Sequence, residues 1–357
     1  MGWEEANCES LTGRTTTTAQ PERSPTPLPA PFPWYGGKSR AASLIWTALG
    51  NVQNYVEPFA GSLAVLLHRP HPPRIETVND KDAFLACVWR SIQMVPAEVA
   101  SWCDRPPNEA DQHAVHAWLV NQRETFTARL MGDPDFYDAR VAGRWLYGIC
   151  CWIGSGWCIG QGPWQSIDGQ LTHLGDAGRG IHRQLTHLGS AGQGIHRKLT
   201  HLGNAGRGEG GLYAYMAALA ARLRHVRVCC GDWTRVLGPS VTTKHGLTGI
   251  VFDPPYAACE DRASSLYSVD DMSVAHDVRH WCQTHGHDPQ LRLVLCGYEQ
   301  THDALLDYGW RSVVWTANGG YGNQRKTADY TNKYRETLWL SPHCLYTDQE
   351  QQLSFFA

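Results

Sequence analysis

The first strongly patterned stretch of the chain has apolar residues at helical spacing. Ala41, Leu44, Ile45, Ala48 and Leu49 recur three and four residues apart, so they share one face. A Gly-Gly pair lies just before them, which is typical of a turn that leads into a helix. The pattern therefore predicts an amphipathic helix after this turn.

Two strand–turn–helix units follow in succession. A short strand at 55–56 leads through a turn into a helix from Ser62, and a strand at 75–78 leads through a turn at 79–80 into a helix from Asp82. Repeated units of this kind predict a parallel sheet with right-handed crossovers. The fold class expected from them is α/β.

The middle of the chain has a different pattern. Residues 95–145 have a helical pattern, and a stretch rich in Trp and Gly follows. The segment "LTHLG" then recurs every fourteen residues, beginning at Leu171, Leu185 and Leu199. This period is shorter than that of the usual solenoid repeats, so we expect a Gly-rich insertion here.

The α/β pattern resumes after this insertion. "LYAYMAALAARLRHV" predicts a helix, and "RVCCGDW", "GLTGIVFDPPY" and "LRLVLCGYE" each predict a strand. "WRSVVWTA" and "RETLWLSP" predict an antiparallel pair that closes the sheet. The strand at 249–252 must end at Asp253, because the two prolines that follow have no N–H to donate to a ladder.

Composition narrows the class of protein only slightly. The net charge is −3, so no overall basic field indicates nucleic acid, although a local basic groove stays open. The first residues lack the basic and apolar regions of a signal peptide, and no apolar run reaches membrane-spanning length. We therefore expect a protein of the reducing cytoplasm with no membrane contact.

Cysteine and tryptophan are read as core residues. Several of the twelve cysteines sit in apolar runs, and Cys150, Cys151 and Cys158 with His173 do not have the spacing of a zinc site, so no metal is expected. The Trp cluster at 145, 152, 157 and 164 favours core packing over a platform for stacking bases.

Acids stand at the ends of three predicted strands. Glu57, Asp80 and Asp232 are each placed to meet a ligand at the carboxyl edge of a parallel sheet, although such acids also cap helices. Asp80 is positioned like the acid that binds ribose hydroxyls, and Asp232 precedes Trp233, a ring on which a base stacks. The glycine fingerprint of nicotinamide enzymes is absent, which argues against that class.

The segment "DPPY" has a chemistry of its own. The exocyclic amine of a nucleobase is a poor nucleophile because its lone pair is delocalised into the ring. A carboxylate and a carbonyl that accept its two N–H groups pull the nitrogen towards tetrahedral geometry. Asp253 offers the carboxylate, Pro254 a carbonyl whose direction is restricted by the proline, and Tyr256 a stacking face. The alternative is a simple turn that ends the strand.

Together these motifs resemble a known family. "PFPWYGGKSR", "YVEPFAGSLAV", "VNDKD", "CGDW" and "VFDPPY" occur in the order found in Dam-like DNA adenine-N6 methyltransferases. The resemblance implies a Rossmann-like class I methyltransferase sheet, S-adenosylmethionine as methyl donor and double-stranded DNA as substrate. It implies catalytic residues at Asp253, Pro254, Pro255 and Tyr256. It implies donor-binding residues at Trp34, Tyr35, Lys38, Glu57, Phe59, Gly61, Ser62, Asp80, Asp232 and Trp233.

The resemblance also implies a division of the chain. The expected parts are a disordered tail at 1–30, a catalytic domain at 31–95 and 212–345, an inserted target-recognition region at 96–211 with the repeat at 171–208, and a C-terminal tail at 346–357. Within the repeat, Arg179, Arg183 and Arg197 are expected to approach DNA phosphates, unless the repeat is only a flexible surface loop. We expect a monomer, and a cognate restriction nuclease stays open as a further partner.

Two departures from the family and two rival functions remain. Leu63 stands where family members often have a second glycine, which is expected to narrow the loop, and the repeat is not a general family feature. The same chemistry suits N4 of cytosine or an RNA base, although an acid at the first position of "DPPY" favours adenine. An inactive DNA-binding relative is the other alternative, but it has no reason to keep all four residues.

Overall fold

The structure is a computed structural model, and it describes residues 27–34, 36–106, 108–152, 157–158, 164–167, 170–173, 211–255, 273–315 and 336–346. Its helices are α1 (Ala42–Leu49), α2 (Ala64–Leu67), α3 (Ala83–Met94), α4 (Pro96–Cys103), α5 (Glu109–Gly132), α6 (Ala139–Cys151), α9 (Gly211–Leu223) and α10 (Val274–His285). Its strands are β1 (Asn54–Glu57), β2 (Ile75–Asp80), β3 (Trp164–Ile167), β4 (Gln170–His173), β5 (Val226–Cys230), β6 (Thr248–Phe252), β7 (Leu291–Tyr298), β8 (Arg311–Val314) and β9 (Glu336–Leu340). Short 3-10 helices are η2 (Trp233–Val236), η3 (Thr243–His245) and η4 (Asp303–Tyr308).

The fold is mixed α/β, built on a seven-stranded, mostly parallel sheet flanked by helices. The strand order is β5-β2-β1-β6-β7-β9-β8, and the first five of these strands are parallel neighbours. Strand β9 runs antiparallel to both β7 and β8, so the predicted closing pair is confirmed. Every strand that the sequence predicted is present in this sheet.

The sheet has a hydrophobic cluster on each face. In β6, Ile250 and Phe252 belong to a cluster with residues of η2, α10 and η4, whereas Val251 between them belongs to the cluster on the α1–α3 side. Successive side chains of a strand point to opposite faces, so this alternation is what a sheet covered on both sides requires.

The strand order also defines a switch point. From β1 the chain adds β2 and then β5 on one side, whereas β6 and β7 are added on the other. In open α/β sheets, ligands bind outside the carboxyl ends of the strands at such a point. The chain's ligand site is therefore expected between the ends of β1 and β6.

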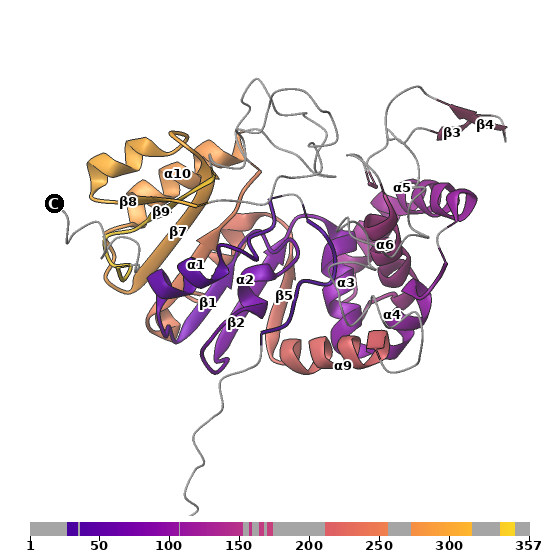
Figure 1. Ribbon diagram of the computed structural model, residues 1–357, viewed down its shortest axis with the longest axis horizontal. Helices are drawn as coiled ribbons and strands as arrows, with labels where there is room; N and C mark the ends of the chain where they lie inside the picture. The colour runs from indigo at the N-terminus through magenta and orange to yellow at the C-terminus, as the bar shows by residue number, and fades with distance from the viewer. Residues whose placement is uncertain are drawn as a thin grey trace, which may run out of the picture.

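The helices of the expected insertion share the core of the catalytic part. Val99 of α4, Leu119 of α5 and Leu146 of α6 lie in the same buried cluster as Trp89 of α3 and Leu219 of α9. Figure 1 shows these five helices gathered at one end of the sheet, beyond β5. Residues 96–151 thus form one helical layer with α3 and α9, although the sequence placed them in the insertion.

Helix α9 is anchored where the chain returns from the insertion. Arg222 of α9 donates to both carboxylate oxygens of Glu76 on β2, at 2.7 and 2.9 Å. Arg69 donates to the same carboxylate at 3.1 Å, and all three side chains are buried. A buried carboxylate is tolerated only when it is paired in this way. The two arginines and Glu76 therefore fix the position of α9 against β2.

Two local features differ from the sequence expectation. Residues 27–30 were assigned to a tail, but the Leu28 N–H donates to the Leu67 carbonyl at 3.2 Å and the Tyr215 hydroxyl donates to the Pro29 carbonyl. Strands β3 and β4 pair as an antiparallel hairpin, and Figure 1 shows it projecting beyond α5. The sequence analysis did not predict this hairpin.

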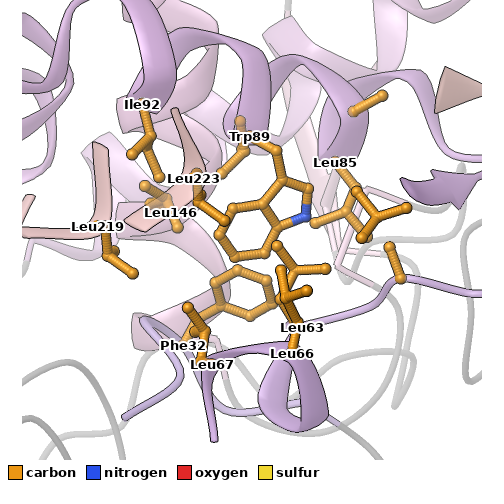
Figure 2. Packing of buried hydrophobic residues seen from close by; sticks show 14 of the residues in the cluster. Phe32, Leu63, Leu66, Leu67, Leu85, Trp89, Ile92, Leu146, Leu219 and Leu223 are labelled. Atoms are coloured by element: carbon orange, nitrogen blue, oxygen red, sulfur yellow. The ribbon is translucent and has the colours of Figure 1, made fainter. Parts of the chain in front are cut away.

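Leu63 has a conformation that its side chain disfavours. Its φ and ψ are 56° and 25°, in the left-handed region, and α2 begins at the next residue. The side chain is fully buried, and Figure 2 shows it beside Leu66 in the cluster around Trp89 and Phe32. It does not line the cleft described below, so this side chain takes no space from the cleft.

Candidate active site

A cleft lies at the carboxyl edge of the sheet, at the switch point. Its open space is about 1040 Å³, including the part that is open to solvent. Its walls come from the ends of β1, β2, β5 and β6 and from the segment before α1. Predicted site residues that line it are Trp34, Lys38, Glu57, Phe59, Gly61, Ser62, Asp80, Asp232, Trp233, Asp253 and Pro255.

The remaining predicted site residues fall elsewhere. Pro254 follows Asp253 but is not among the lining residues. Tyr35, Tyr256 and the three arginines of the repeat (Arg179, Arg183 and Arg197) lie outside the described residues. Their predicted roles stay predictions.

The loop after β1 is held against the end of β2. The Gly61 N–H donates to Asp80 Oδ2 at 3.1 Å, and the Asp82 N–H donates to Asp80 Oδ1 at 3.0 Å. Burial raises the pKa of Asp80 to about 6 from an ordinary 3.8, although these two N–H groups act to lower it. A carboxylate with several lone pairs keeps acceptor capacity for a ligand after two such bonds.

Gly61 is required by its surroundings as well as by its backbone. Its φ is +47°, and a Cβ at this position would stand 2.6 Å from Trp34 Nε1. The Trp34 ring in turn packs edge-on against Phe32 and at a tilt against Trp145 of α6. The Trp34 side chain of the N-terminal segment therefore covers the loop at Gly61, where the absence of a Cβ leaves room for the ring.

Asn79 braces the loops on both sides of β2, and sequence reasoning missed it as a site residue. Its side-chain amide donates to the Pro58 carbonyl and to the Gly231 carbonyl, both at 3.0 Å. The main-chain carbonyl of Asn79 accepts a hydrogen bond from the Ala60 N–H at 2.8 Å. The signal in the sequence is a polar residue just before the final acid of a buried strand.

Glu57 serves the structure of the loop as well as the cleft. Its Oε1 accepts from the Tyr55 hydroxyl and from the Leu66 N–H of α2 at 3.0 Å. Burial raises the pKa of Glu57 to about 8 from an ordinary 4.5, which outweighs the lowering effect of these two bonds. At neutral pH this side chain therefore favours its protonated form.

The aromatic residues of the cleft differ in how much of each ring is exposed. Trp233 is 8% exposed and packs in the core, stacked on Phe59 at 6.1 Å between ring centroids and edge-on to Phe252. Phe59 is only half-buried, so it has more surface for a ligand than Trp233 has. Asp232 is exposed and accepts from the Thr234 N–H at 2.9 Å, as the cap of η2.

A buried lysine joins the catalytic corner to the closing strand. Lys38 Nζ lies 2.8 Å from Asp253 Oδ1 and 4.0 Å from Glu336 Oε2, and it also donates to the Gly36 carbonyl. Burial acts to lower the pKa of Lys38, but the carboxylates of Asp253 and Glu336 outweigh it and hold the pKa above its ordinary value. Lys38 is therefore a cation that faces the predicted catalytic acid.

Glu336 was missed because of where acids were sought. The sequence search took acids at the carboxyl ends of strands, but Glu336 is the first residue of β9. Because β9 is antiparallel to β7, its first residue pairs with Tyr298 at the carboxyl end of β7. An antiparallel strand thus brings its amino end to the same edge of the sheet.

The expectation that the Trp cluster of the middle region packs in the core is tested by its burial. Trp145, Trp152 and Trp157 are each at most 9% exposed, so their predicted place in the core is confirmed, whereas the Trp164 side chain lies outside the described set. Within the described ranges, no group of three His, Cys, Asp or Glu side chains is arranged to hold a metal ion. Among the described helices, none is both long and apolar enough to cross a membrane.

Comparison with known proteins finds a family model that matches part of the chain. Residues 34–129 match the family model of D12 class N6 adenine-specific DNA methyltransferases. The match begins at Trp34, includes the loops after β1 and β2, and continues through α4 into α5, across the border expected at 95–96. No curated protein matches the chain. Over these residues the chain is therefore similar to the D12 class, the Dam-like family, and the similarity supports DNA adenine methylation as the activity.

Proposed function

We propose that the chain has the Rossmann-like class I methyltransferase fold and binds S-adenosylmethionine in the cleft at its switch point. Residues 31–95 and 212–345 form the catalytic domain in this proposal. One observation carries it, namely that residues from four strand ends and from the segment before α1 line a single cleft. Ligand sites of α/β folds have this place and this make-up.

The lining residues suit each part of S-adenosylmethionine. Asp80 has acceptor capacity for ribose hydroxyls, Asp232 for the adenine amine, and Phe59 presents a ring for stacking. Gly61 lets a ligand approach the backbone of the loop closely, beneath Trp34. When bound, S-adenosylmethionine supplies a methyl group on a positively charged sulfur, and the cleft offers carboxyl groups to that charge.

Asp253 is proposed to accept an N–H of the target amine. It stands at the end of β6, where Pro254 and Pro255 end the strand and make the corner stiff. The Pro254 carbonyl accepts the second N–H, and Tyr256 stacks on the base as the family resemblance implies. The target adenine must leave the duplex to reach this corner, which takes a few kcal/mol.

The substrate is proposed to be double-stranded DNA, recognised by the region 96–211. In the described part of that region, the β3–β4 hairpin stands farthest from the sheet (Figure 1). Three further points stay predictions. They are the contacts of Arg179, Arg183 and Arg197 with DNA phosphates, the monomeric state of the protein, and the existence of a partner nuclease.

The test is a transfer assay with identification of the product. The protein is incubated with unmodified double-stranded DNA and isotope-labelled S-adenosylmethionine, and the DNA is digested to nucleosides. We expect the label in N6-methyladenine. Label in N4-methylcytosine, or label only when RNA replaces DNA, would overturn the proposal.

An Asp253→Asn variant tests the catalytic residue. It keeps the shape of the side chain, and Lys38 still faces Glu336, so we expect a folded protein that binds the methyl donor but transfers at least about 100-fold more slowly. Asp277→Asn on the exposed face of α10 is the matched control and should transfer normally. Unimpaired transfer by Asp253→Asn would refute the role of this carboxylate.

A further inference from the structure

Helix α5 holds the turn at residues 157–158 through both main-chain groups of Cys158. The Cys158 N–H donates to Nδ1 of His116 at 3.3 Å, and the Cys158 carbonyl accepts from the Arg123 guanidinium at 2.8 Å. Cys158 is 1% exposed and has a left-handed φ of 59°. A residue with a Cβ keeps such a conformation only where its surroundings impose it. The two α5 side chains thus fix the backbone at Cys158, and strand β3 begins farther along the chain at Trp164.

Arg123 also reaches the cleft. A second nitrogen of its guanidinium lies 3.3 Å from Asp82 Oδ1, and the guanidinium lies over the Phe84 ring, 4.7 Å from the ring centroid. Asp82 lines the cleft, and it caps α3 because its Oδ1 also accepts from the Phe84 N–H at 2.9 Å. One side chain of α5 therefore bonds to a wall of the cleft and to the 157–158 turn at the same time.

A short series of hydrogen bonds links the proposed ribose site to Arg123. Asp80 is proposed above to accept from the ribose hydroxyls of the methyl donor, and a carboxylate bonded in this way is held in one position. The Asp82 N–H donates to Asp80 Oδ1 at 3.0 Å, and the Asp82 carboxylate accepts from Arg123. Groups that share a hydrogen-bond network are energetically coupled. Donor binding at Asp80 therefore restricts the movement of Arg123 and of the Cys158 carbonyl bonded to it.

The guanidinium group suits a bridge between two acceptors. Its N–H groups form a rigid planar fork, so one nitrogen bonds to Asp82 while another bonds to Cys158. Its contact with the Phe84 ring restricts the tilt of this plane. A lysine has the same charge, but its ammonium is a single point on a flexible chain and joins two acceptors less rigidly. Charge and bridging can therefore be separated by one substitution.

We infer that Arg123 is a positioning residue that couples the donor cleft to the turn leading to the β3–β4 hairpin, so that bound methyl donor strengthens DNA binding and bound DNA strengthens donor binding. By thermodynamic linkage these two effects are equal in size. The inference rests on the donor site and on the recognition of DNA by the region 96–211 that are proposed above. It adds the side chain through which one site affects the other.

The first test measures this coupling by binding alone. Sinefungin, an analogue of S-adenosylmethionine that transfers no methyl group, is titrated by calorimetry with and without a duplex containing the sequence methylated in the transfer assay. We expect the duplex to raise the sinefungin affinity of the wild type by roughly fivefold or more. Arg123→Lys should bind sinefungin alone within about twofold of the wild type, and the duplex should raise its affinity by at most about twofold.

Arg144→Lys is the matched control. Arg144 of α6 pairs with Asp111 of α5 at 2.8 Å, so the same substitution alters an arginine–aspartate pair of the same helix at a residue that does not line the cleft. This variant should keep the coupling of the wild type.

Asp82→Asn tests the other end of the bridge. Asparagine keeps the cap of α3 but removes the charge that faces Arg123. It should reduce the coupling as Arg123→Lys does, and it supplies the test if the lysine variant does not fold.

Hydrogen exchange gives a structural readout of the same bridge. Sinefungin without DNA should slow the exchange of the Cys158 N–H in the wild type, because the network that holds this turn becomes more rigid. The slowing should be lost in Arg123→Lys and kept in Arg144→Lys. A role of Arg123 in stability alone would change the exchange equally with and without sinefungin.

The outcomes separate the inference from the proposed function. If the wild type binds no sinefungin or methylates no DNA, the proposed function fails. If it does both but the duplex leaves its sinefungin affinity unchanged, the inference on Arg123 is wrong. The inference is also wrong if Arg123→Lys keeps the coupling of the wild type, or if Arg144→Lys loses as much coupling as Arg123→Lys. Equal losses of sinefungin affinity with and without DNA in Arg123→Lys would overturn it too, by showing that Arg123 only supports the wall of the cleft.

Discussion

Leu63 allows a backbone conformation and a buried contact to be measured separately. Its left-handed φ of 56° costs about 1–2 kcal/mol for a residue with a Cβ. Its side chain is fully buried against the cluster around Trp89, and truncating such a leucine to alanine typically costs about 2–5 kcal/mol. The burial therefore outweighs the strain, which explains how a leucine is tolerated in a left-handed backbone conformation.

Two substitutions make this comparison. Leu63→Ala loses the packing and keeps the strain, whereas Leu63→Gly loses the packing and relieves the strain. We expect both to be less stable than the wild type by about 2–4 kcal/mol, with the glycine variant about 1 kcal/mol more stable than the alanine variant. Donor affinity should not change, because this side chain does not line the cleft.

The assay is denaturant unfolding followed by tryptophan fluorescence, with the slope checked to be equal in the three proteins. If Leu63→Gly were as stable as the wild type, the buried side chain would contribute nothing and the reasoning on packing would be wrong. If Leu63→Ala were at least as stable as Leu63→Gly, the left-handed conformation would carry no strain.

Two further predictions concern the cleft itself. Between pH 4.5 and about 8, Glu57 is ionised in the unfolded chain and protonated in the folded chain, so folding takes up a proton. The free energy of unfolding therefore falls as pH rises, by up to about 1.4 kcal/mol per pH unit. Glu57→Gln keeps an acceptor for Tyr55 and Leu66 but takes up no proton, so we expect a flatter profile in unfolding experiments from pH 5.5 to 7.5, and an unchanged slope would contradict the assignment. Gly61→Ala introduces a Cβ 2.6 Å from Trp34 Nε1 at a φ of +47°, so Trp34 must move. We expect calorimetry to show weaker binding of the methyl donor, and we expect the free energy of unfolding to fall by at least about 1 kcal/mol. Gly132→Ala at the end of α5, where a Cβ meets nothing within 4 Å, is the control, and equal affinity of Gly61→Ala and wild type would refute the role of the close approach.

Much of the fold was predictable because its signals are local. Alternating and helical apolar spacing predicted the strands of the seven-stranded sheet and the helices α1, α3 and α9, and the paired prolines predicted the end of β6 at Phe252. Asp80, Asp232 and Asp253 were found because parallel strands bring their carboxyl ends to one edge, so a strand-ending acid can be assigned to that edge before any contact is known.

Other features depended on which distant segments pack together. Glu336 reaches Lys38 only because β9 is antiparallel to β7, and the direction of a strand leaves no trace in its own residues. The amide of Asn79 reaches two loops because β2 lies between β1 and β5, and the Leu63 side chain turns into the core rather than towards the cleft because α3 and the Phe32 segment surround it. Helices α4 to α6 join the same core because their apolar faces meet α3 and α9. Local pattern thus determined the elements and most of the chemistry, and long-range packing decided which side chains complete the site.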